Sequence, residues 1–171
     1  IIPIDEQHLR LEEEGVRFFL LTGSRSALLI DSGMQTHNAK KLAEGLTALP
    51  LSLLNTHADI DHIGSNEEFD AVYMNPAELV NYPLAKKASD IIPIRDGNSI
   101  DLGGRRLEVI EIPGHTPGSI AILDVERRVL FSGDTVQDGS IFLFGPMRNI
   151  PAFYHSLKRL ESMTGRFDLV Y

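Results

Sequence analysis

Residues 56–64 bring four side chains that can bind metal, two imidazoles and two carboxylates, into six consecutive positions. The apolar segment 51–56 predicts a short buried strand that delivers its last residues to a loop. On an extended backbone, side chains at i and i+2 point the same way, so His57 and Asp59 can share one ion. The adjacent pair Asp61 and His62 can diverge towards a second ion. The cluster therefore predicts a two-metal site at a strand end.

Two later segments also place a side chain that can bind metal in a loop after an apolar run. The sequence from Ile112 to Ser119 follows an apolar run and places His115 in a loop rich in glycine and proline. The segment 130–135 places Asp134 after another apolar run. Histidine and aspartate are common in polar connections, so each segment alone is compatible with an ordinary loop. Three such segments in one chain favour a metal site.

The order of these motifs resembles that of the metallo-β-lactamase superfamily. The likeness extends over the whole chain, because residues 27–33 also match the strand and turn before the first helix of that family. The resemblance implies an α/β fold, a four-layer αββα sandwich, whereas the sequence pattern alone indicates only mixed α and β. Several zinc β-lactamases of this family hold their second metal with cysteine, a residue that this chain lacks. The chain offers Asp134 instead, as glyoxalase II-like hydrolases do. The motifs are specific for the fold and say little about the substrate.

Carried over to this chain, the resemblance implies a ligand set for two metals. The first would be bound by His57, Asp59 and His115, the second by Asp61 and His62, and Asp134 would bridge both. The family supplies one more histidine after a strand near the C-terminus, whereas this sequence stops at Tyr171. We expect that ligand to be cut off, so that the C-terminal part of the fold is truncated. The alternative is a degenerate second site.

Asp59 stands where the commonest family pattern has histidine. Three aspartates and a bridging hydroxide balance the four positive charges of two divalent metals, so the ligand set predicts a neutral cluster. A neutral cluster is the poorer Lewis acid, and we expect Asp59→His to raise the affinity for anionic inhibitors. The carboxylate oxygen of Asp59 is also a harder ligand than an imidazole nitrogen, so the first site accommodates harder metal ions more readily. Zinc is the expected metal, with iron and manganese as alternatives.

The remaining candidates surround these ligands. Asp61 either orients the nucleophile and passes a proton to the leaving group, or acts as a plain ligand. Four further residues are candidates for holding the ligands in place, or for ordinary loop hydrogen bonding: Asp31, Thr56, Thr116 and Ser119. The apolar segment 141–147 is assigned to the core in preference to a substrate wall. His8 and His155 are assigned to the surface.

The predicted activity is hydrolysis of an ester, thioester or lactone by a metal-bridging hydroxide. The substrate is expected to be a small molecule, and the residues that bind it are unknown. A flavodiiron-like redox protein with two iron ions is the first alternative, since those proteins place a carboxylate at the position of Asp59. A metal-binding domain without catalysis is the second alternative.

Length, composition and charge indicate the number of domains and the kinds of partner to expect. The 171 residues, 43% of them hydrophobic, suffice for one domain spanning 1–171. No apolar run approaches the roughly 18 residues that cross a bilayer, so we expect no membrane partner. The net charge of −8 argues against nucleic acid, whose phosphates require clustered basic residues. A cytoplasmic location is expected, although a signal removed before Ile1 would change it.

Periodicity predicts strands and helices in alternation. Strands are expected at 16–22, 27–30, 51–55 and 71–74, and hairpins at 100–112 and 120–131. Helices are expected at 37–49 with Thr36 as cap, from Pro76 with Asn75 as cap and Glu78 in a capping box, and at 150–164.

Overall fold

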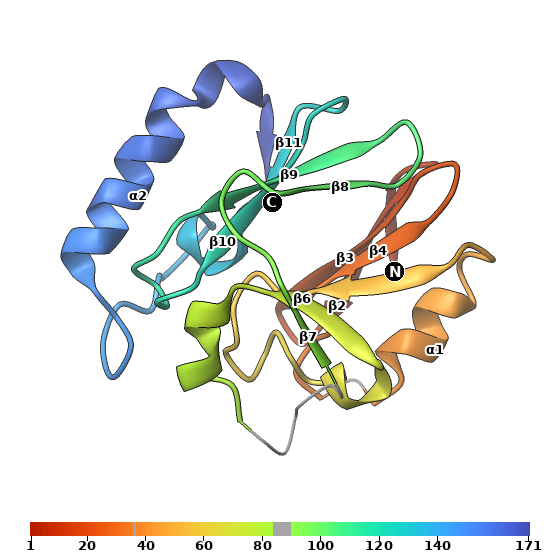
Figure 1. Cartoon of the computed structure of the whole chain (residues 1–171), viewed down its shortest axis with the longest axis horizontal. Coiled ribbons are helices and arrows are strands. Elements are labelled where there is room, and N and C mark those ends of the chain that lie inside the picture. Colours follow the sequence, from red (N-terminus) through yellow and green to blue (C-terminus); the bar gives the residue numbers. More distant parts are fainter. Residues whose placement is uncertain (36, 84–89) are drawn as a thin grey trace.

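Two β-sheets pack face to face, and one α-helix covers the outer side of each (Figure 1). The structure is a computed structural model that describes residues 1–35, 37–83 and 90–171. The first sheet contains, in spatial order, β1 (Ile2–Asp5), β2 (His8–Glu13), β3 (Val16–Thr22), β4 (Ala27–Ile30), β5 (Leu51–Leu54), β6 (Ala71–Met74) and β7 (Asp90–Pro93). The second contains β12 (Leu169–Val170), β11 (Val129–Phe131), β10 (Ile120–Asp124), β9 (Arg106–Glu111) and β8 (Ser99–Asp101).

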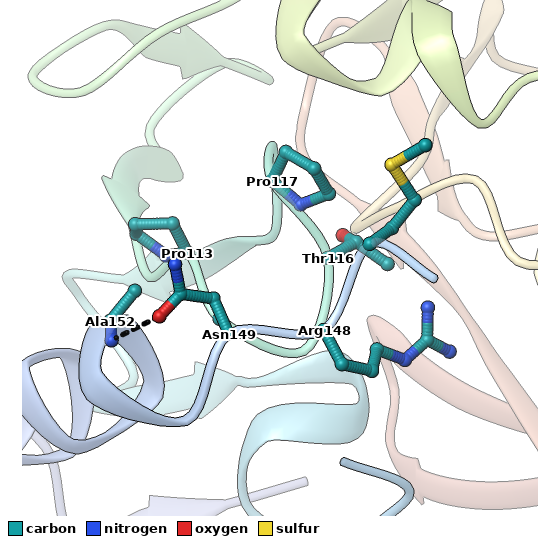
Figure 2. A pocket seen from close by; sticks show the side chains of 8 residues that line it. Pro113, Thr116, Pro117, Arg148, Asn149 and Ala152 are labelled. Carbon is teal, nitrogen blue, oxygen red and sulfur yellow. Dashed lines mark hydrogen bonds between the residues drawn. The ribbon is translucent and has the colours of Figure 1, made fainter. Parts of the chain in front are cut away.

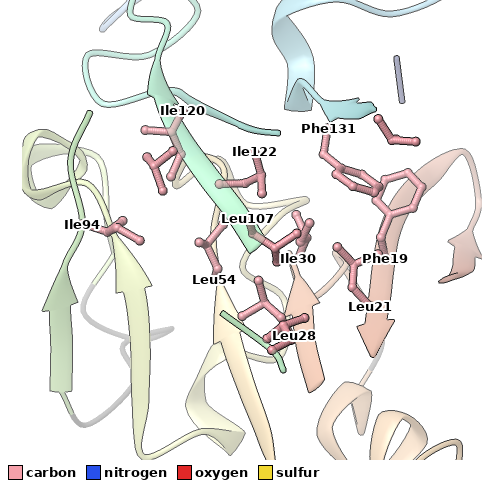
Figure 3. Packing of buried hydrophobic residues seen from close by; sticks show 13 residues of the cluster. Phe19, Leu21, Leu28, Ile30, Leu54, Ile94, Leu107, Ile120, Ile122 and Phe131 are labelled. Atoms are coloured by element: carbon pink, nitrogen blue, oxygen red, sulfur yellow. The ribbon is translucent and has the colours of Figure 1, made fainter. Parts of the chain in front are cut away.

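Three apolar clusters fill the spaces between the layers. Strands of both sheets contribute to the central cluster, in which Leu28 and Leu54 of the first sheet pack with Ile122 and Phe131 of the second (Figure 3). A second cluster joins the first sheet to α1, and a third joins the second sheet to Leu160 of α2. The predicted four-layer αββα sandwich is therefore confirmed.

The helices are shorter than the sequence predicts. α1 spans Ala39–Glu44 and α2 spans Ile150–Ser162, where Asn149 accepts a hydrogen bond from the backbone N–H of Ala152. The segment after Asn75 forms the 3₁₀-helix η2 (Pro76–Val80), which Asn75 caps as predicted. Thr36, the predicted cap of α1, lies outside the described residues. The other described 3₁₀-helices are η1 (Asn66–Glu68), η4 (Gly133–Thr135) and η5 (Thr164–Arg166).

The predicted strands and hairpins are all present, with ends that shift by one or two residues. The prediction missed β1, β2 and β7. Their sequences mix charged residues with apolar ones, and β1 and β7 also contain proline. Such sequences are tolerated because these strands lie towards the two edges of the first sheet and are partly exposed to solvent. His8 in β2 is buried and packs against three aromatic rings, so its assignment to the surface was wrong.

Strand direction brings the motif loops to one rim of the sandwich. β4 and β5 are parallel, with Ile30 opposite Leu54, so that Asp31 and the segment from Thr56 leave the sheet together. The backbone N–H of Ile120 donates to the carbonyl of Thr56 at 2.9 Å, which joins the second sheet to the same rim. No helix in the described ranges is long and apolar enough to cross a membrane.

Candidate metal centre

Three imidazoles from two loops meet at this rim. The ring centroid of His57 lies 4.0 Å from that of His62 and 4.9 Å from that of His115. With two carboxylates they form two groups whose ligand atoms all lie within 4.8 Å of one another. One group contains His57, Asp59 and His115, and the other contains His57, His62 and Asp134. Five of the six residues that the sequence predicts as ligands are thus brought together.

The distances between these atoms suit a metal ion. Asp59 Oδ2 lies 3.6 Å from His57 Nε2 and 3.1 Å from His115 Nε2. His62 Nε2 lies 3.2 Å from Asp134 Oδ1. Two ligands of a tetrahedral zinc ion, each about 2.0–2.1 Å from it, lie about 3.3 Å apart. These three distances are therefore close to the separation that such an ion requires.

In each of the three histidines, Nδ1 contacts an oxygen atom. His57 Nδ1 lies 3.0 Å from the hydroxyl of Thr56, His62 Nδ1 lies 2.9 Å from Asp31 Oδ2, and His115 Nδ1 lies 3.0 Å from the carbonyl of Phe142. A proton on Nδ1 leaves Nε2 as the free acceptor, which is how metal-binding histidines are oriented. His57 Nε2 is buried and has no hydrogen-bond partner among the described residues. The chemistry of the donor set and this unpartnered atom both fit a metal ion.

Asp31 supports two of these histidines. Its Oδ1 accepts from the backbone N–H of Thr56 at 2.8 Å, and its Oδ2 accepts from the hydroxyl of Thr56 at 2.8 Å as well as contacting His62. The hydroxyl of Thr56 thus donates to Asp31 and is left to accept from Nδ1 of His57. Asp31 has a φ of 62°, a conformation that aspartate tolerates better than most residues.

The two remaining predicted ligands differ in position. Asp134 belongs to the second group, with Oδ1 near His62, and its Oδ2 also lies 3.7 Å from Nε2 of His115 in the first group. Asp61 is part of neither group, and its Oδ2 lies 3.7 Å from His62 Nε2. It is the more exposed of the two carboxylates and lies at the edge of the cluster.

The cluster also shifts the ionisation of its members. Burial alone would raise the pKa of Asp59, but the neighbouring imidazoles of His115 and His57 and the amide of Asn81 hold it far below its usual value. The pKa of Asp134 is likewise lowered, because contact with His62 outweighs its burial. The pKa of His62 is raised despite complete burial, because Asp31 and Asp134 flank it. Both carboxylates therefore stay ionised, as ligands must.

Glu78 connects the two loops that carry most of the cluster. This carboxylate is fully buried, and it accepts from the backbone N–H groups of Ala58 at 2.7 Å and Gly118 at 2.6 Å. The predicted capping box of Glu78 is therefore wrong, because its side chain serves these loops instead of the start of η2. Sequence reasoning missed this role, since an isolated glutamate at a helix start carries no sign of burial.

Arg148 and Asn81 also contact the cluster, and neither was predicted. Both donate to the carboxylate of Asp59, Asn81 at 2.9 Å. Arg148 lies beside a cavity of about 380 Å³ between the loop that carries His115 and the start of α2 (Figure 2). No local pattern marks either residue, because the contacts join positions 22 and 89 residues apart.

The other predicted residues lie close by. The hydroxyls of Thr116 and Ser119 contact each other at 2.7 Å and hold the turn after His115. The assignment of segment 141–147 to the core is wrong, because Phe142 is 54% exposed and Phe144 is 74% exposed. The carbonyl contact of Phe142 with His115 places this apolar loop beside the cluster.

Comparisons with known proteins identify the family of this chain. The family model described as "Metallo-beta-lactamase superfamily" matches residues 12–166. The acyl-coenzyme A thioesterase MBLAC2 of Gallus gallus is 32% identical over 197 residues, which span 92% of this chain and 71% of that protein. A hydroxyacylglutathione hydrolase of Gloeobacter violaceus is 31% identical over 148 residues, which span 83% of this chain and 56% of that protein.

Solved structures share the fold. The crystal structure of TTHA1623 in a di-iron-bound form superposes on this chain with a TM-score of 0.74 at 29% sequence identity. The match covers 94% of this chain and 88% of that one. A metallo-beta-lactamase from Pontibacter korlensis has a TM-score of 0.78 at 18% identity, covering 99% and 87%. The resemblance to this superfamily, and to its glyoxalase II-like branch, is confirmed. The chain belongs to the metallo-beta-lactamase superfamily.

Proposed function

We propose that this chain is a dinuclear metal-dependent hydrolase of acyl thioesters, with 1–171 as its single domain. The observation that carries the proposal is the cluster itself: three imidazoles whose Nδ1 atoms are held and whose Nε2 atoms face two carboxylates. Such an arrangement suits metal binding, because each histidine presents the nitrogen that a metal requires. His57, Asp59 and His115 would hold one ion, Asp61 and His62 the other, and Asp134 both.

Two divalent ions at this site would polarise an acyl carbonyl and activate water near neutral pH. The protein residues then have separate tasks. The two oxygens of Asp134 face different histidines, which suits a carboxylate that would help to hold both ions. Asp61 lies at the exposed edge, where it can orient the attacking water, take up the proton that this water loses and pass it to the leaving thiolate. Zinc is the proposed metal.

The choice of a thioester rests on two observations. Two of the relatives reported above are named for hydrolysis of acyl groups carried on thiols, coenzyme A and glutathione. The exposed rings of Phe142 and Phe144 lie 5.2 Å apart, on the loop whose carbonyl contacts His115. An apolar surface next to the reacting centre suits an acyl chain, because covering it removes apolar area from water.

The direct test is metal content followed by hydrolysis. Protein purified without chelators should contain two zinc ions per chain, and should cleave acyl-coenzyme A with release of free thiol. Asp134→Ala should abolish this release, whereas the exposed Asp138→Ala should leave it unchanged. Replacing Phe142 and Phe144 together by serine should raise KM for long acyl chains more than for acetyl. Activity that survives Asp134→Ala would refute the proposed mechanism.

A second candidate function is a redox reaction at two iron ions. It is favoured by Asp59, an oxygen ligand suited to harder metals, and by the di-iron-bound form of TTHA1623. Iron with visible absorption, bound tightly by protein that fails to cleave thioesters, would support it. Less than one metal per chain would support a domain without catalysis.

A further inference from the structure

Arg148 forms an ion pair with one proposed metal ligand and contacts another. Its Nη2 contacts Asp59 Oδ2, its Nη1 lies 3.4 Å from Asp59 Oδ1, and its Nη2 lies 3.5 Å from His115 Nε2. The guanidinium thus covers both oxygens of the carboxylate. The side chains of Arg148 and Asp59 are only 14% and 18% exposed, so solvent screens this pair weakly.

The backbone on each side fixes where Arg148 points. The N–H of Asn149 donates to the carbonyl of Gly114 at 2.8 Å, and the side chain of Asn149 caps α2 through Ala152. The first bond ties the start of α2 to the loop that carries His115, and the cap between Asn149 and Ala152 is shown in Figure 2. Arg148 is therefore presented to Asp59 by a helix start, and its buried Nε has no hydrogen-bond partner in residues 1–35, 37–83 and 90–171. In the described part of the chain, its side-chain hydrogen bonds and ion pair involve the two terminal nitrogens of the guanidinium.

The charge of Arg148 changes the balance at the centre. Counting ligands alone gives a neutral cluster, because Asp59 adds a negative charge where the commonest family pattern has a neutral histidine. Arg148 supplies one positive charge at that carboxylate. We propose that Arg148 is the built-in counter-cation of Asp59, so that the two residues together act on the first metal as a neutral ligand. The proposal rests on the metal centre proposed above and names a positioning residue within it.

Two opposite effects on the protein follow. In metal-free protein, Arg148 stabilises a largely buried carboxylate whose other contacts in the described part of the chain are with histidines and one amide. In metal-loaded protein, the same guanidinium opposes the ion and draws electron density from its ligand. Arg148 therefore raises the stability of the metal-free protein and limits the affinity of the first site.

The test is a double-mutant cycle on the full chain, with zinc as the probe. Four proteins are compared: the natural sequence, Arg148→Met, Asp59→His and the double variant. Zinc affinity is measured by competition with a chromophoric chelator, and the melting temperature is measured on metal-free protein. Methionine keeps the length of the apolar stem and removes the charge. The exposed Arg95→Met is the matched control and should leave both measurements unchanged.

We expect Arg148→Met to bind the first zinc at least about tenfold more tightly and to melt at a lower temperature without metal. Asp59→His alone should weaken zinc binding, because Arg148 then faces the ion without a partner. The double variant should bind zinc at least about tenfold more tightly than Asp59→His does. A purely structural role for Arg148 would lower the melting temperature and leave zinc affinity unchanged.

The outcomes separate this inference from the proposed function. If the natural sequence binds two zinc ions and cleaves thioesters, but Arg148→Met binds zinc no more tightly and the double variant no better than Asp59→His, the counter-cation is refuted and the hydrolase stands. If the natural sequence binds no divalent metal, both proposals fail. Should Arg148→Met fail to fold, Arg148→Gln gives the same comparison with a polar side chain.

Discussion

Asp31 Oδ2 lies 2.9 Å from His62 Nδ1, and the same oxygen accepts a hydrogen bond from the hydroxyl of Thr56. Thr56 in turn contacts Nδ1 of His57. The carboxylate of Asp31, at the end of β4, therefore orients two imidazoles that follow the neighbouring strand β5. The arrangement has a local origin. β4 and β5 run parallel, so residues that follow them leave the sheet side by side.

Asp31→Asn should weaken zinc binding by about 10–100-fold, with little change in the backbone. Asparagine adopts positive φ as readily as aspartate, so the turn at φ 62° is kept. The amide, however, lacks the charge that favours a proton on Nδ1 of His62. Competition with a chelator measures the effect, and the exposed Asp70→Asn serves as control. Equal zinc affinity in all three proteins would show that Asp31 does not orient the histidines.

The sequence predicted the parts of the centre that local order determines. His57, Asp59 and His62 lie within one loop after a recognisable strand, and His115 and Asp134 each follow another strand. Residues that act from a distance carry no such pattern. Glu78, for example, reaches Ala58 and Gly118 across 20 and 40 positions, and its burial depends on loops that pack around it.

Edge strands were missed for a related reason. β1 and β7 lie at the edges of the first sheet and are largely exposed to solvent. Charged residues and proline are tolerated at such positions. Alternation that would identify a half-buried strand is therefore broken in their sequences. His8 shows the same limit, because its burial depends on rings contributed by Phe131 and Tyr171, far along the chain.

Glu78→Gln should destabilise the protein by about 1–3 kcal/mol and weaken zinc binding as well. Glutamine keeps one acceptor oxygen, but its amide N–H group must face one of the two backbone N–H donors, of Ala58 or Gly118. One buried donor is then left unsatisfied and the two ligand loops separate. Urea unfolding and chelator competition measure the two effects, with the exposed Glu44→Gln as control. A loss of stability with full zinc affinity would limit Glu78 to the fold.

Gly64→Ala should cost about 1–3 kcal/mol of stability, since the loop after His62 packs directly against the turn after β4. A Cβ at this position would lie 2.5 Å from the carbonyl oxygen of Gly33 and 2.6 Å from that of Met34. Backbone must therefore move, and the loop that carries His62 moves with it. Gly165→Ala is the control, because a Cβ there meets nothing within 4 Å. Thermal unfolding that is equal in both variants would contradict the prediction.

His8 makes stability depend on pH in a region far from the metal centre in sequence. It is 1% exposed, and burial together with the charge of Arg105 lowers its pKa from 6.5 to about 4. Between these two values the unfolded chain binds a proton that the folded chain does not. His8 therefore has its full stabilising effect above pH 6.5, and that effect declines as the pH falls towards 4.

The loss at pH 4 should be of the order of 3 kcal/mol relative to a variant that lacks the titration. His8→Phe is that variant, because phenylalanine fits the rings of Phe19 and Phe131 around it. Urea unfolding at several pH values should show the natural protein losing stability against His8→Phe on acidification, whereas the exposed His155→Gln should follow the natural protein. A direct NMR titration of His8 in the natural protein is the second measurement. A midpoint near 6.5 would mean that water reaches this imidazole in the folded state and that its burial has no effect on acid stability.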